Sequence, residues 1–343
     1  MKTFSEDITV DVLSLYDRLH NKLLSYYETI WADKRDNLVL EQWLNNFKGN
    51  ANGNYIEKER LHGAYLLSKF TYFGNVEIRE LIKSVYRDLF RYPIVYKIRK
   101  TNADTKDSAL IDSLFETELA QTRFLGMGNP SESGVHMLYY FRQENFLSKK
   151  YFIHPHEIYE THILENKDDS GMIKRQHHLK IKNGNISRYV FIDDFCGSGC
   201  QASEYLNQSV VTLKELKKDV EIDYLMLIGT EDGIKKLRSL KCSDNTPLLN
   251  SVEAIFIIDN SFKCFDSNSR YFSQVPTSEI DKDFCKEMCE KYGEMLYADA
   301  PLGFNNGQLM LAFFHNTPDN TMPIFWNETN NWVPAFKRFG KIY

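Results

Sequence analysis

The pattern of apolar residues changes near Tyr92, and this change constrains the fold more than any other feature of the chain. Beyond it, short apolar runs alternate with stretches of helical spacing; the runs are YPIVYKI, RFLGM, KYFI, RYVFIDD, IDYLMLIG, VEAIFIID, QLMLAFF and MPIFW. Several runs are continuous, which is typical of parallel strands covered on both faces by helices. The pattern predicts an α/β domain over residues 92–343, with a doubly wound and mostly parallel sheet.

The first 91 residues show helical spacing without strand-like alternation. Apolar residues recur three and four positions apart within 10–24, 38–47 and 61–73, and a further helix is predicted from Val76 to Phe90. A loop rich in Gly and Asn, GNANGN, separates the second helix from the third. Residues 1–91 are therefore predicted to form an N-terminal helical domain.

Composition narrows the classes of function. The formal net charge of −5 argues against a general polyanion-binding protein, because affinity for a phosphate backbone comes from clustered Lys and Arg. The N-terminus lacks the apolar core of a signal peptide, and no apolar run approaches the roughly 20 residues that span a bilayer. From these features we expect a cytoplasmic protein without a membrane segment.

Six cysteines are spread along the chain, and two pairs have C-x3-C spacing. Cytosolic thiols are expected to be reduced. Cys285 and Cys289 fall on one face of a predicted helix. We therefore expect them to pack as small apolar residues and not to bind a metal. The other pair, Cys196 and Cys200, flanks a glycine loop, for which the next segment predicts a role in ligand binding.

The most informative segment is RYVFIDDFCGSGCQASEYL, residues 188–206. An apolar strand at 189–192 runs into Asp193 and Asp194, a short loop follows, and a helix is predicted to start near Gln201. Glycines let a loop approach a ligand closely, and its unpaired amides bind phosphate together with the helix dipole. Two carboxylates at the end of a strand can hold vicinal hydroxyls, directly or through a divalent ion. The segment predicts a sugar-phosphate site; the alternative is an acidic turn whose glycines serve geometry alone.

This segment resembles the ribose-phosphate signature of the type I phosphoribosyltransferases, in which four apolar residues and two acids precede two or three variable residues and Thr-Gly-x-Thr. Ser198 takes the place of the first Thr, and Gln201 departs from the pattern because an amide, which can still donate to phosphate, replaces a hydroxyl. The resemblance implies that Asp193 and Asp194 are catalytic residues that hold the ribose hydroxyls and Mg²⁺. It also implies that the 5-phosphate binds to the loop that follows, made of Phe195, Cys196, Gly197, Ser198, Gly199, Cys200 and Gln201.

A second loop rich in small residues lies upstream, within residues 123–146. Glycines and hydroxyl residues between a short strand and a helix can present N–H and O–H donors to an anion. Type I phosphoribosyltransferases carry a pyrophosphate loop in this chain order. The resemblance implies pyrophosphate binding by Gly128, Asn129, Ser131 and Ser133. The alternative is a helix N-cap with turn glycines.

The polar stretch between the two loops, residues 165–188, is basic in its second half. In the family this position is often a flexible loop that closes over the substrate, and a cationic lid would offset charge on departing pyrophosphate. A solvated charged hairpin is the alternative, and Asn183-Gly184 indicates a hairpin turn before the strand that ends in the acids. Downstream, residues 227–237 repeat the strand–glycine–helix theme and are expected to serve the fold.

The C-terminal region is expected to hold two strands, from Gln308 and from Met322, around a polar turn at 315–321. The turn could wall the ligand pocket or simply end a hairpin. PLGF, FHNTPDNT and the W-L-x-x-F element at 43–47 resemble a group of bacterial phosphoribosyltransferase-like proteins associated with anti-phage conflict and retron-like systems. That resemblance covers nearly the whole chain and implies a context of antiviral defence.

Two classes of function follow from these motifs. The first is a pentosyltransferase of the phosphoribosyltransferase type, which binds 5-phosphoribosyl pyrophosphate with Mg²⁺ and transfers or releases the pentosyl group as a defence effector. The second is a catalytically inactive sensor of a nucleotide or sugar phosphate, or a regulatory subunit of a defence complex. A protein partner would dock on the N-terminal helical domain, and no motif points directly to nucleic acid.

Overall fold

The computed structural model describes residues 10–31, 37–51, 53, 55–167, 173–273 and 279–340. The chain divides into two compact units: unit 1 is Met1–Ile78 with Ile258–Tyr343, and unit 2 is Arg79–Ile257. This division differs from the boundary predicted after residue 91. Residues 79–91 belong with the sheet, because Phe90 packs against Phe124 of a strand, with ring centroids 4.9 Å apart.

The C-terminal segment also lies outside the predicted α/β domain, because it packs with the N-terminal helices. Trp43, buried in helix α2 (Asn37–Leu44), donates from Nε1 to the carbonyl of Ile324 at 2.7 Å and stacks on Phe325 with ring centroids 5.6 Å apart. The W-L-x-x-F element therefore anchors the C-terminal segment in the core of unit 1.

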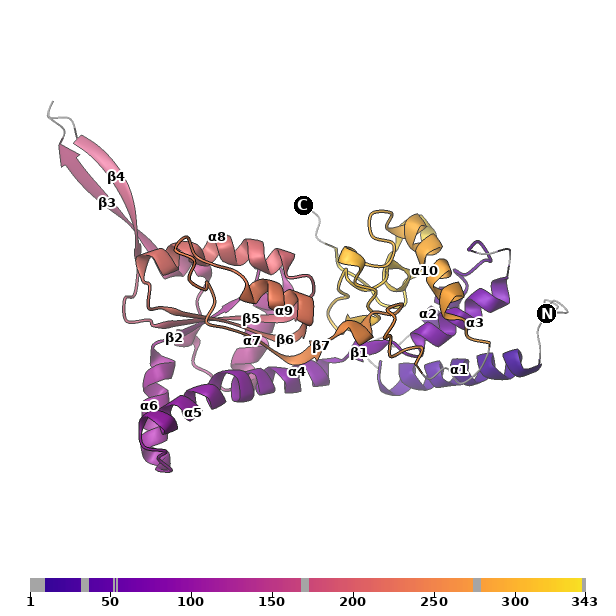
Figure 1. Ribbon diagram of the computed structural model, residues 1–343, viewed down its shortest axis with the longest axis horizontal. Helices are drawn as coiled ribbons and strands as arrows, with labels where there is room; N and C mark the ends of the chain where they lie inside the picture. Colours follow the sequence, from indigo (N-terminus) through magenta and orange to yellow (C-terminus); the bar gives the residue numbers. More distant parts are fainter. Residues whose placement is uncertain are drawn as a thin grey trace. The chain divides into compact units, whose positions relative to one another are not determined.

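The secondary structure is as follows (Figure 1). Unit 1 contains α1 (Val10–Thr29), α2, α3 (Ile56–Leu67), β1 (Thr71–Phe73), η4 (Asn260–Phe262), α10 (Lys282–Leu296), η5 (Phe304–Asn306), β8 (Leu311–Phe313), η6 (Pro323–Phe325) and η7 (Thr329–Asn331). Helix α4 (Asn75–Ser84) leads from unit 1 into unit 2. Unit 2 continues with η1 (Val85–Arg91), α5 (Tyr92–Thr101), α6 (Ser108–Ala120), β2 (Thr122–Gly126), α7 (Ser133–Glu144), η2 (Lys149–Tyr151), η3 (Pro155–Ile158), β3 (Tyr159–Lys167), β4 (Ile173–Ile181), β5 (Arg188–Cys196), α8 (Cys200–Leu216), β6 (Glu221–Thr230), α9 (Glu231–Arg238) and β7 (Ser251–Ile258).

Unit 2 is built on a four-stranded sheet with the order β2-β5-β6-β7. β5 pairs in parallel with β2 on one side and with β6 on the other, so that Ile192 lies opposite Gly126 and Asp193 opposite Met226. These strands coincide with the apolar runs RFLGM, RYVFIDD and IDYLMLIG, and a fourth run, VEAIFIID, forms β7. The predicted mixed α/β fold with parallel strands is confirmed for this unit.

Helices cover both faces of this sheet. On one face, Leu206 of α8 and Ile234 of α9 share a buried cluster with Phe191 of β5. On the other face, Phe124 of β2 packs against Phe141 of α7 with ring centroids 5.1 Å apart. Burial on both faces explains why these strands are apolar without interruption.

Three of the predicted strands take other forms, and a fourth is shorter and pairs outside the main sheet. YPIVYKI is helix α5, because its Pro occupies the first helical turn and Ile94 and Ile98, four positions apart, are its buried residues. KYFI gives η2 and a single bridge from Phe152 to Phe124. QLMLAFF yields only β8, which pairs in parallel with β1 in unit 1 and not with the main sheet. MPIFW forms the 3₁₀ turn η6, which starts at its proline.

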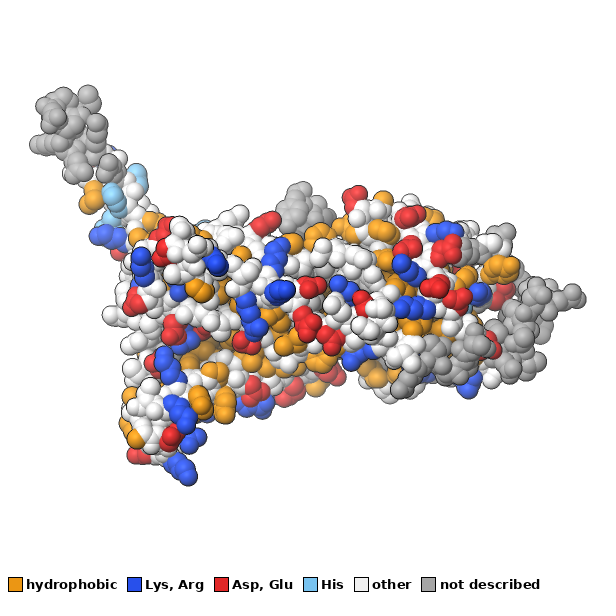
Figure 2. All heavy atoms as spheres, in the orientation of Figure 1, with side chains coloured by type: hydrophobic (Ala, Val, Ile, Leu, Met, Phe, Trp, Pro, Cys, Tyr) orange, Lys and Arg blue, Asp and Glu red, His pale blue; other side chains and the backbone are white. Residues whose placement is uncertain are grey.

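An antiparallel hairpin of β3 and β4 projects from unit 2 (Figure 1). The hairpin turn predicted at Asn183-Gly184 is wrong: β4 pairs with β3, and the residues that follow lead into the parallel strand β5. His162 lies opposite His178, and both are exposed. Histidine side chains lie on the surface of this hairpin (Figure 2). Residues 168–172 lie outside the described residues, and the role of residues 165–188 as a lid stays a prediction.

No helix within the described ranges is long and apolar enough to cross a membrane.

Glu59 provides a test of the packing of unit 1. Its buried carboxylate accepts hydrogen bonds from Gly49 N at 2.7 Å, Ala51 N at 2.8 Å and Tyr292 Oη at 2.6 Å. Glu59→Ala is expected to lower the free energy of unfolding by about 3 kcal/mol, because three donors would be left without their acceptor. All four tryptophans lie in unit 1, so tryptophan fluorescence in urea reports on this unit. The same change at half-buried Glu57 is the control, and an equal loss there would contradict the prediction.

Candidate active site

The strand–loop–helix element around the paired acids has the predicted order. β5 continues through Cys196, residues 197–199 bend, and α8 begins at Cys200. Both acids therefore lie within the strand, which extends beyond the end predicted at residue 192. Gly199 precedes α8 with φ of +71°, a left-handed conformation that favours glycine. The first-turn amides of this 17-residue helix have no intrahelical acceptor, and with the helix dipole they can bind an anion at the bend.

The two acids occupy different hydrogen-bonding environments. Asp193 accepts a hydrogen bond from the hydroxyl of Tyr224, which is fully buried in β6, and another from its neighbour's amide at 2.9 Å. Asp194 is almost fully buried and accepts from the hydroxyl of Ser133 at 2.8 Å. Burial, and then the adjacent carboxylate of Asp194, raise the pKa of Asp193 well above its ordinary value. Asp193 therefore keeps its proton to a higher pH than an ordinary aspartate does.

The upstream loop lies next to these acids. β2 and β5 are parallel neighbours, so their C-terminal ends meet at one edge of the sheet, and Met127 N donates to the carbonyl of Ile192 at 3.1 Å. Gly134 lets α7 approach closely, since a Cβ there would lie 2.4 Å from the carbonyl oxygen of Met127. This approach places Ser133, the first residue of α7, against Asp194. The predicted pyrophosphate loop thus contacts the acid pair that precedes the predicted 5-phosphate loop.

The other three predicted residues of the upstream loop differ in their exposure to solvent. Gly128 is buried with φ of +87°, while Asn129 and Ser131 are exposed. Gln201, the departure from the family signature, donates to the carboxylate of Glu132 at 2.8 Å. Glu132 was not predicted as a site residue. The signal that could have identified it is its charge, because the residues around it in the loop are uncharged.

Residues 230–236, which were expected to serve only the fold, contact the loop at residues 195–201, called the phosphate loop below for its predicted ligand. Thr230 donates from its hydroxyl to the carbonyl of Gly197 at 2.6 Å. Gly233 packs so closely that a Cβ there would lie 2.2 Å from the same carbonyl oxygen. Lys236 of α9 places Nζ 2.9 Å from the thiol sulfur of Cys200. Sequence reasoning missed these contacts because only the pairing of β5 with β6 brings residues 230–236 to the loop.

The two cysteines of the loop differ in chemistry. Cys200 is half-buried, and the hydrogen bond from Lys236, followed by the one with Ser198, lowers the pKa of its thiol. Burial raises the pKa of Cys196 to about 12, with Asp193 adding to the effect. The predicted helical pair, Cys285 and Cys289, is buried in α10 among apolar residues, as expected.

Comparison with known proteins identifies the family. The family model described as PRTase-CE matches residues 40–338. The chain belongs to the PRTase-CE family. This membership makes the protein phosphoribosyltransferase-like, in agreement with the resemblance found in the segment 188–206. No curated protein matches the chain.

Solved structures with similarity to this PRTase-CE chain are remote. A hypothetical protein of Neisseria gonorrhoeae with bound ppGpp is 12% identical, with 56% of this chain and 85% of that chain covered and a TM-score of 0.24. The AQ2163 protein of Aquifex aeolicus is 9% identical, with 65% and 86% covered and a TM-score of 0.25. The xanthine-guanine-hypoxanthine phosphoribosyltransferase of Helicobacter pylori is 9% identical, with 55% and 92% covered and a TM-score of 0.21. Similarities of this size carry no argument about function.

The PRTase-CE chain offers two adjacent carboxylates to a cation. Within the described ranges, no group of three or more His, Cys, Asp or Glu side chains is arranged to hold a metal ion. Mg²⁺ commonly takes only one or two protein carboxylates and fills its other positions with water and substrate phosphates. The donor set of Asp193 and Asp194 therefore fits Mg²⁺ in the presence of a phosphorylated substrate.

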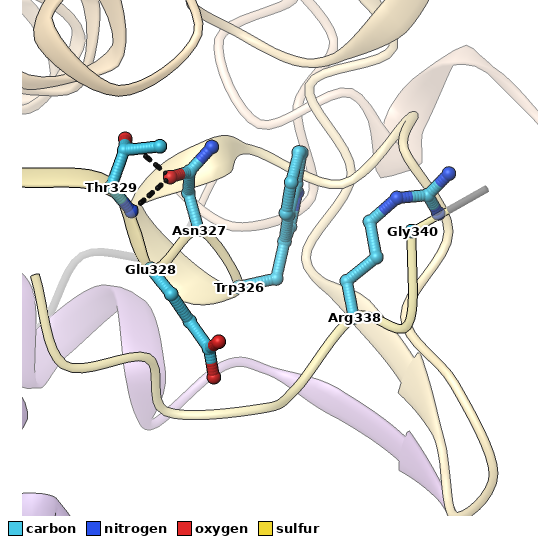
Figure 3. Close-up of a pocket in the computed structure, with 6 residues that line it drawn as sticks. All are labelled: Trp326, Asn327, Glu328, Thr329, Arg338 and Gly340. Atoms are coloured by element: carbon cyan, nitrogen blue, oxygen red, sulfur yellow. Dashed lines mark hydrogen bonds between the residues drawn. The ribbon is translucent and has the colours of Figure 1, made fainter. Parts of the chain in front are cut away.

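A separate pocket lies in unit 1 and contains none of the predicted site residues. Its volume is about 340 Å³, and its lining includes Trp326, Asn327, Glu328 and Arg338 (Figure 3). Arg338 donates to the carbonyl of Thr317 at 2.6 Å and to Asp319 at 3.0 Å. The turn at 315–321 therefore holds a residue of this pocket in place. The phosphate loop belongs to unit 2.

The raised pKa of Asp193 predicts a dependence of stability on pH. The pKa of Asp193 is higher in the folded protein than in the unfolded chain. Between these two pKa values the folded protein binds more protons, so the free energy of unfolding falls as the pH rises through this range. Asp194→Asn removes the second carboxylate and keeps an oxygen acceptor for Ser133. We expect this variant to gain on the order of 1 kcal/mol of unfolding free energy at pH 8 and little at pH 4. Urea denaturation followed by circular dichroism at both pH values tests this; a gain that is equal at both would contradict it.

Proposed function

We propose that this PRTase-CE protein binds 5-phosphoribosyl pyrophosphate, or a related ribose phosphate, and transfers or releases its pentosyl group. The observation that carries the proposal is the contact between Ser133 and Asp194 at 2.8 Å. It joins the loop predicted to bind pyrophosphate to the acid predicted to hold the ribose, directly before the loop predicted to bind the 5-phosphate. A single substrate that carries both groups, with a pentose between them, suits two such loops in contact.

In the proposed reaction, the bond between C1 of the ribose and the pyrophosphate oxygen breaks, and its electron pair leaves with pyrophosphate. A nitrogenous base, another nucleophile or water then attacks C1. The amides at 197–201 would fix the 5-phosphate, and Asp194, oriented by Ser133, would accept a hydrogen bond from a ribose hydroxyl. Positioning and electrostatic stabilisation would supply most of the rate enhancement.

Magnesium is the proposed cofactor. Asp193 and Asp194 would hold it, and when bound it would neutralise charge on the pyrophosphate. The adjacency of the two carboxylates in β5 supports this assignment, because a cation between them would compensate both charges. Ser133 would keep one of the two carboxylates in a fixed orientation.

Pyrophosphate release tests the proposal. The protein is incubated with 5-phosphoribosyl pyrophosphate and Mg²⁺, with and without nucleobases and cell extract, and the release of pyrophosphate is followed. Turnover is the expected result. Tight binding without turnover under every condition would instead identify the inactive sensor, and the absence of measurable affinity for any sugar phosphate would refute both functions.

We also propose that the protein acts in the cytoplasm as an effector of a bacterial anti-phage system. The resemblance of PLGF, FHNTPDNT and the 43–47 element to proteins of such systems supports this context. A plaque assay in a phage-sensitive bacterium that expresses the protein with its genomic neighbours is the test. Protection that requires Asp193 and Asp194 is expected; equal plaque numbers with and without the protein would contradict the defence role.

A further inference from the structure

Lys236 brings a full positive charge to the phosphate loop from a different element. Its Nζ lies 2.9 Å from the sulfur of Cys200, the first residue of α8. Its Cβ lies 3.5 Å from the position that a Cβ on Gly199 would occupy. The side chain therefore lies against the end of the bend, where α8 starts.

The position of Lys236 is fixed by backbone packing. The helix that carries it, α9, begins after Thr230, whose hydroxyl accepts from Gly233 N at 3.0 Å and donates to the carbonyl of Gly197 at 2.6 Å. Gly233 itself packs directly against that carbonyl, with no room for a side chain. Two contacts thus tie the first turn of α9 to the bend, and Lys236 lies one turn further along.

A phosphate bound at this loop would lie near acidic side chains, so a cation beside it would favour binding. Asp193, Asp194 and Glu132 bring three carboxyl groups to the two loops, and Glu132 reaches the end of the phosphate loop through Gln201. A sugar phosphate carries nearly two negative charges at neutral pH. Backbone amides and a helix N-terminus supply only partial charges against it, whereas an ammonium group supplies a whole one.

We propose that Lys236 binds the phosphate group of the ligand, and that the thiol of Cys200 holds its ammonium group at the loop until the ligand arrives. This inference rests on the proposed sugar-phosphate site and adds a binding residue from α9 to it. The ligand phosphate would replace Cys200 as the partner of Lys236. A bound phosphate would also cover Cys200, since the sulfur lies within hydrogen-bond distance of the same ammonium group.

Affinity for ribose 5-phosphate tests the assignment. Lys236→Gln is expected to raise the Kd for ribose 5-phosphate by about tenfold or more, because it removes a charge-assisted hydrogen bond to an anion. Lys235→Gln on the same helix is the matched control and should leave the Kd within about twofold of wild type. Equal affinity of the wild-type and Lys236→Gln proteins would overturn the assignment. Absence of binding by the wild-type protein would instead refute the sugar-phosphate site on which it rests.

Thiol alkylation gives a second measurement that a purely structural role of Lys236 would not move. Iodoacetamide modification of Cys200 is followed by peptide mass spectrometry, with half-buried Cys242 as the internal reference. We expect the rate at Cys200 relative to Cys242 to fall severalfold in Lys236→Gln and to fall in the wild-type protein on addition of ribose 5-phosphate. A rate that ribose 5-phosphate leaves unchanged at saturation would overturn the exchange of partners.

Discussion

The double variant Asp193→Asn/Asp194→Asn is expected to release pyrophosphate from 5-phosphoribosyl pyrophosphate at least about 100-fold more slowly than the wild-type protein, because the groups that orient the ribose and hold Mg²⁺ lose their charge. The acceptor oxygens for Ser133 and Tyr224 are kept, so the fold is expected to persist. Release is measured at saturating substrate with Mg²⁺.

Asp219→Asn is the matched control for this loss. Asp219 is an exposed acid of the same unit, between α8 and β6, and its replacement should leave the rate unchanged. A wild-type rate of pyrophosphate release in the double variant would show that neither acid takes part in the reaction. A parallel loss in the control would indicate a general effect of charge.

Gly233→Ala is expected to weaken the binding of ribose 5-phosphate by about tenfold to a hundredfold, because displacement of a binding loop by a fraction of an ångström disrupts its contacts. The new Cβ would lie 2.2 Å from the carbonyl oxygen of Gly197, which is backbone and can yield only if the phosphate loop moves away from α9. Overpacking of this kind is also expected to cost about 1–3 kcal/mol of stability.

Gly184→Ala is the corresponding control, since a Cβ at that glycine meets no atom within 4 Å. Its affinity for ribose 5-phosphate should match that of the wild-type protein. Unchanged affinity in Gly233→Ala, with a folded protein by circular dichroism, would show that the phosphate does not depend on the conformation of this bend.

The sheet of unit 2 could be predicted from the sequence because its strands are buried on both faces and therefore apolar throughout. The same criterion failed at YPIVYKI, where Ile94 and Ile98 satisfy helical spacing as well as an apolar run. It also failed to show that QLMLAFF pairs with β1, a three-residue strand with no pattern of its own. The return of the C-terminal segment to Trp43 has no local signal, because it depends on contacts between residues about 280 positions apart.

The candidate site shows the same limit. The acids and the glycine bend are contiguous in sequence, so their order along strand, loop and helix could be predicted. Tyr224 and Lys236 could not, because their relation to the loop arises only when β6 pairs with β5. Ser133 was predicted as an anion donor from its loop, but its contact with Asp194 follows from the pairing of β2 with β5.

Calorimetric titration of the wild-type protein with ribose 5-phosphate and with ribose tests most directly whether residues 195–201 bind a phosphate. The account predicts saturable binding of one ribose 5-phosphate per chain, at least about tenfold tighter than that of ribose, since the phosphate makes the charge-assisted contacts. Equal affinities for the two sugars, or no heat of binding with any sugar phosphate, would contradict it.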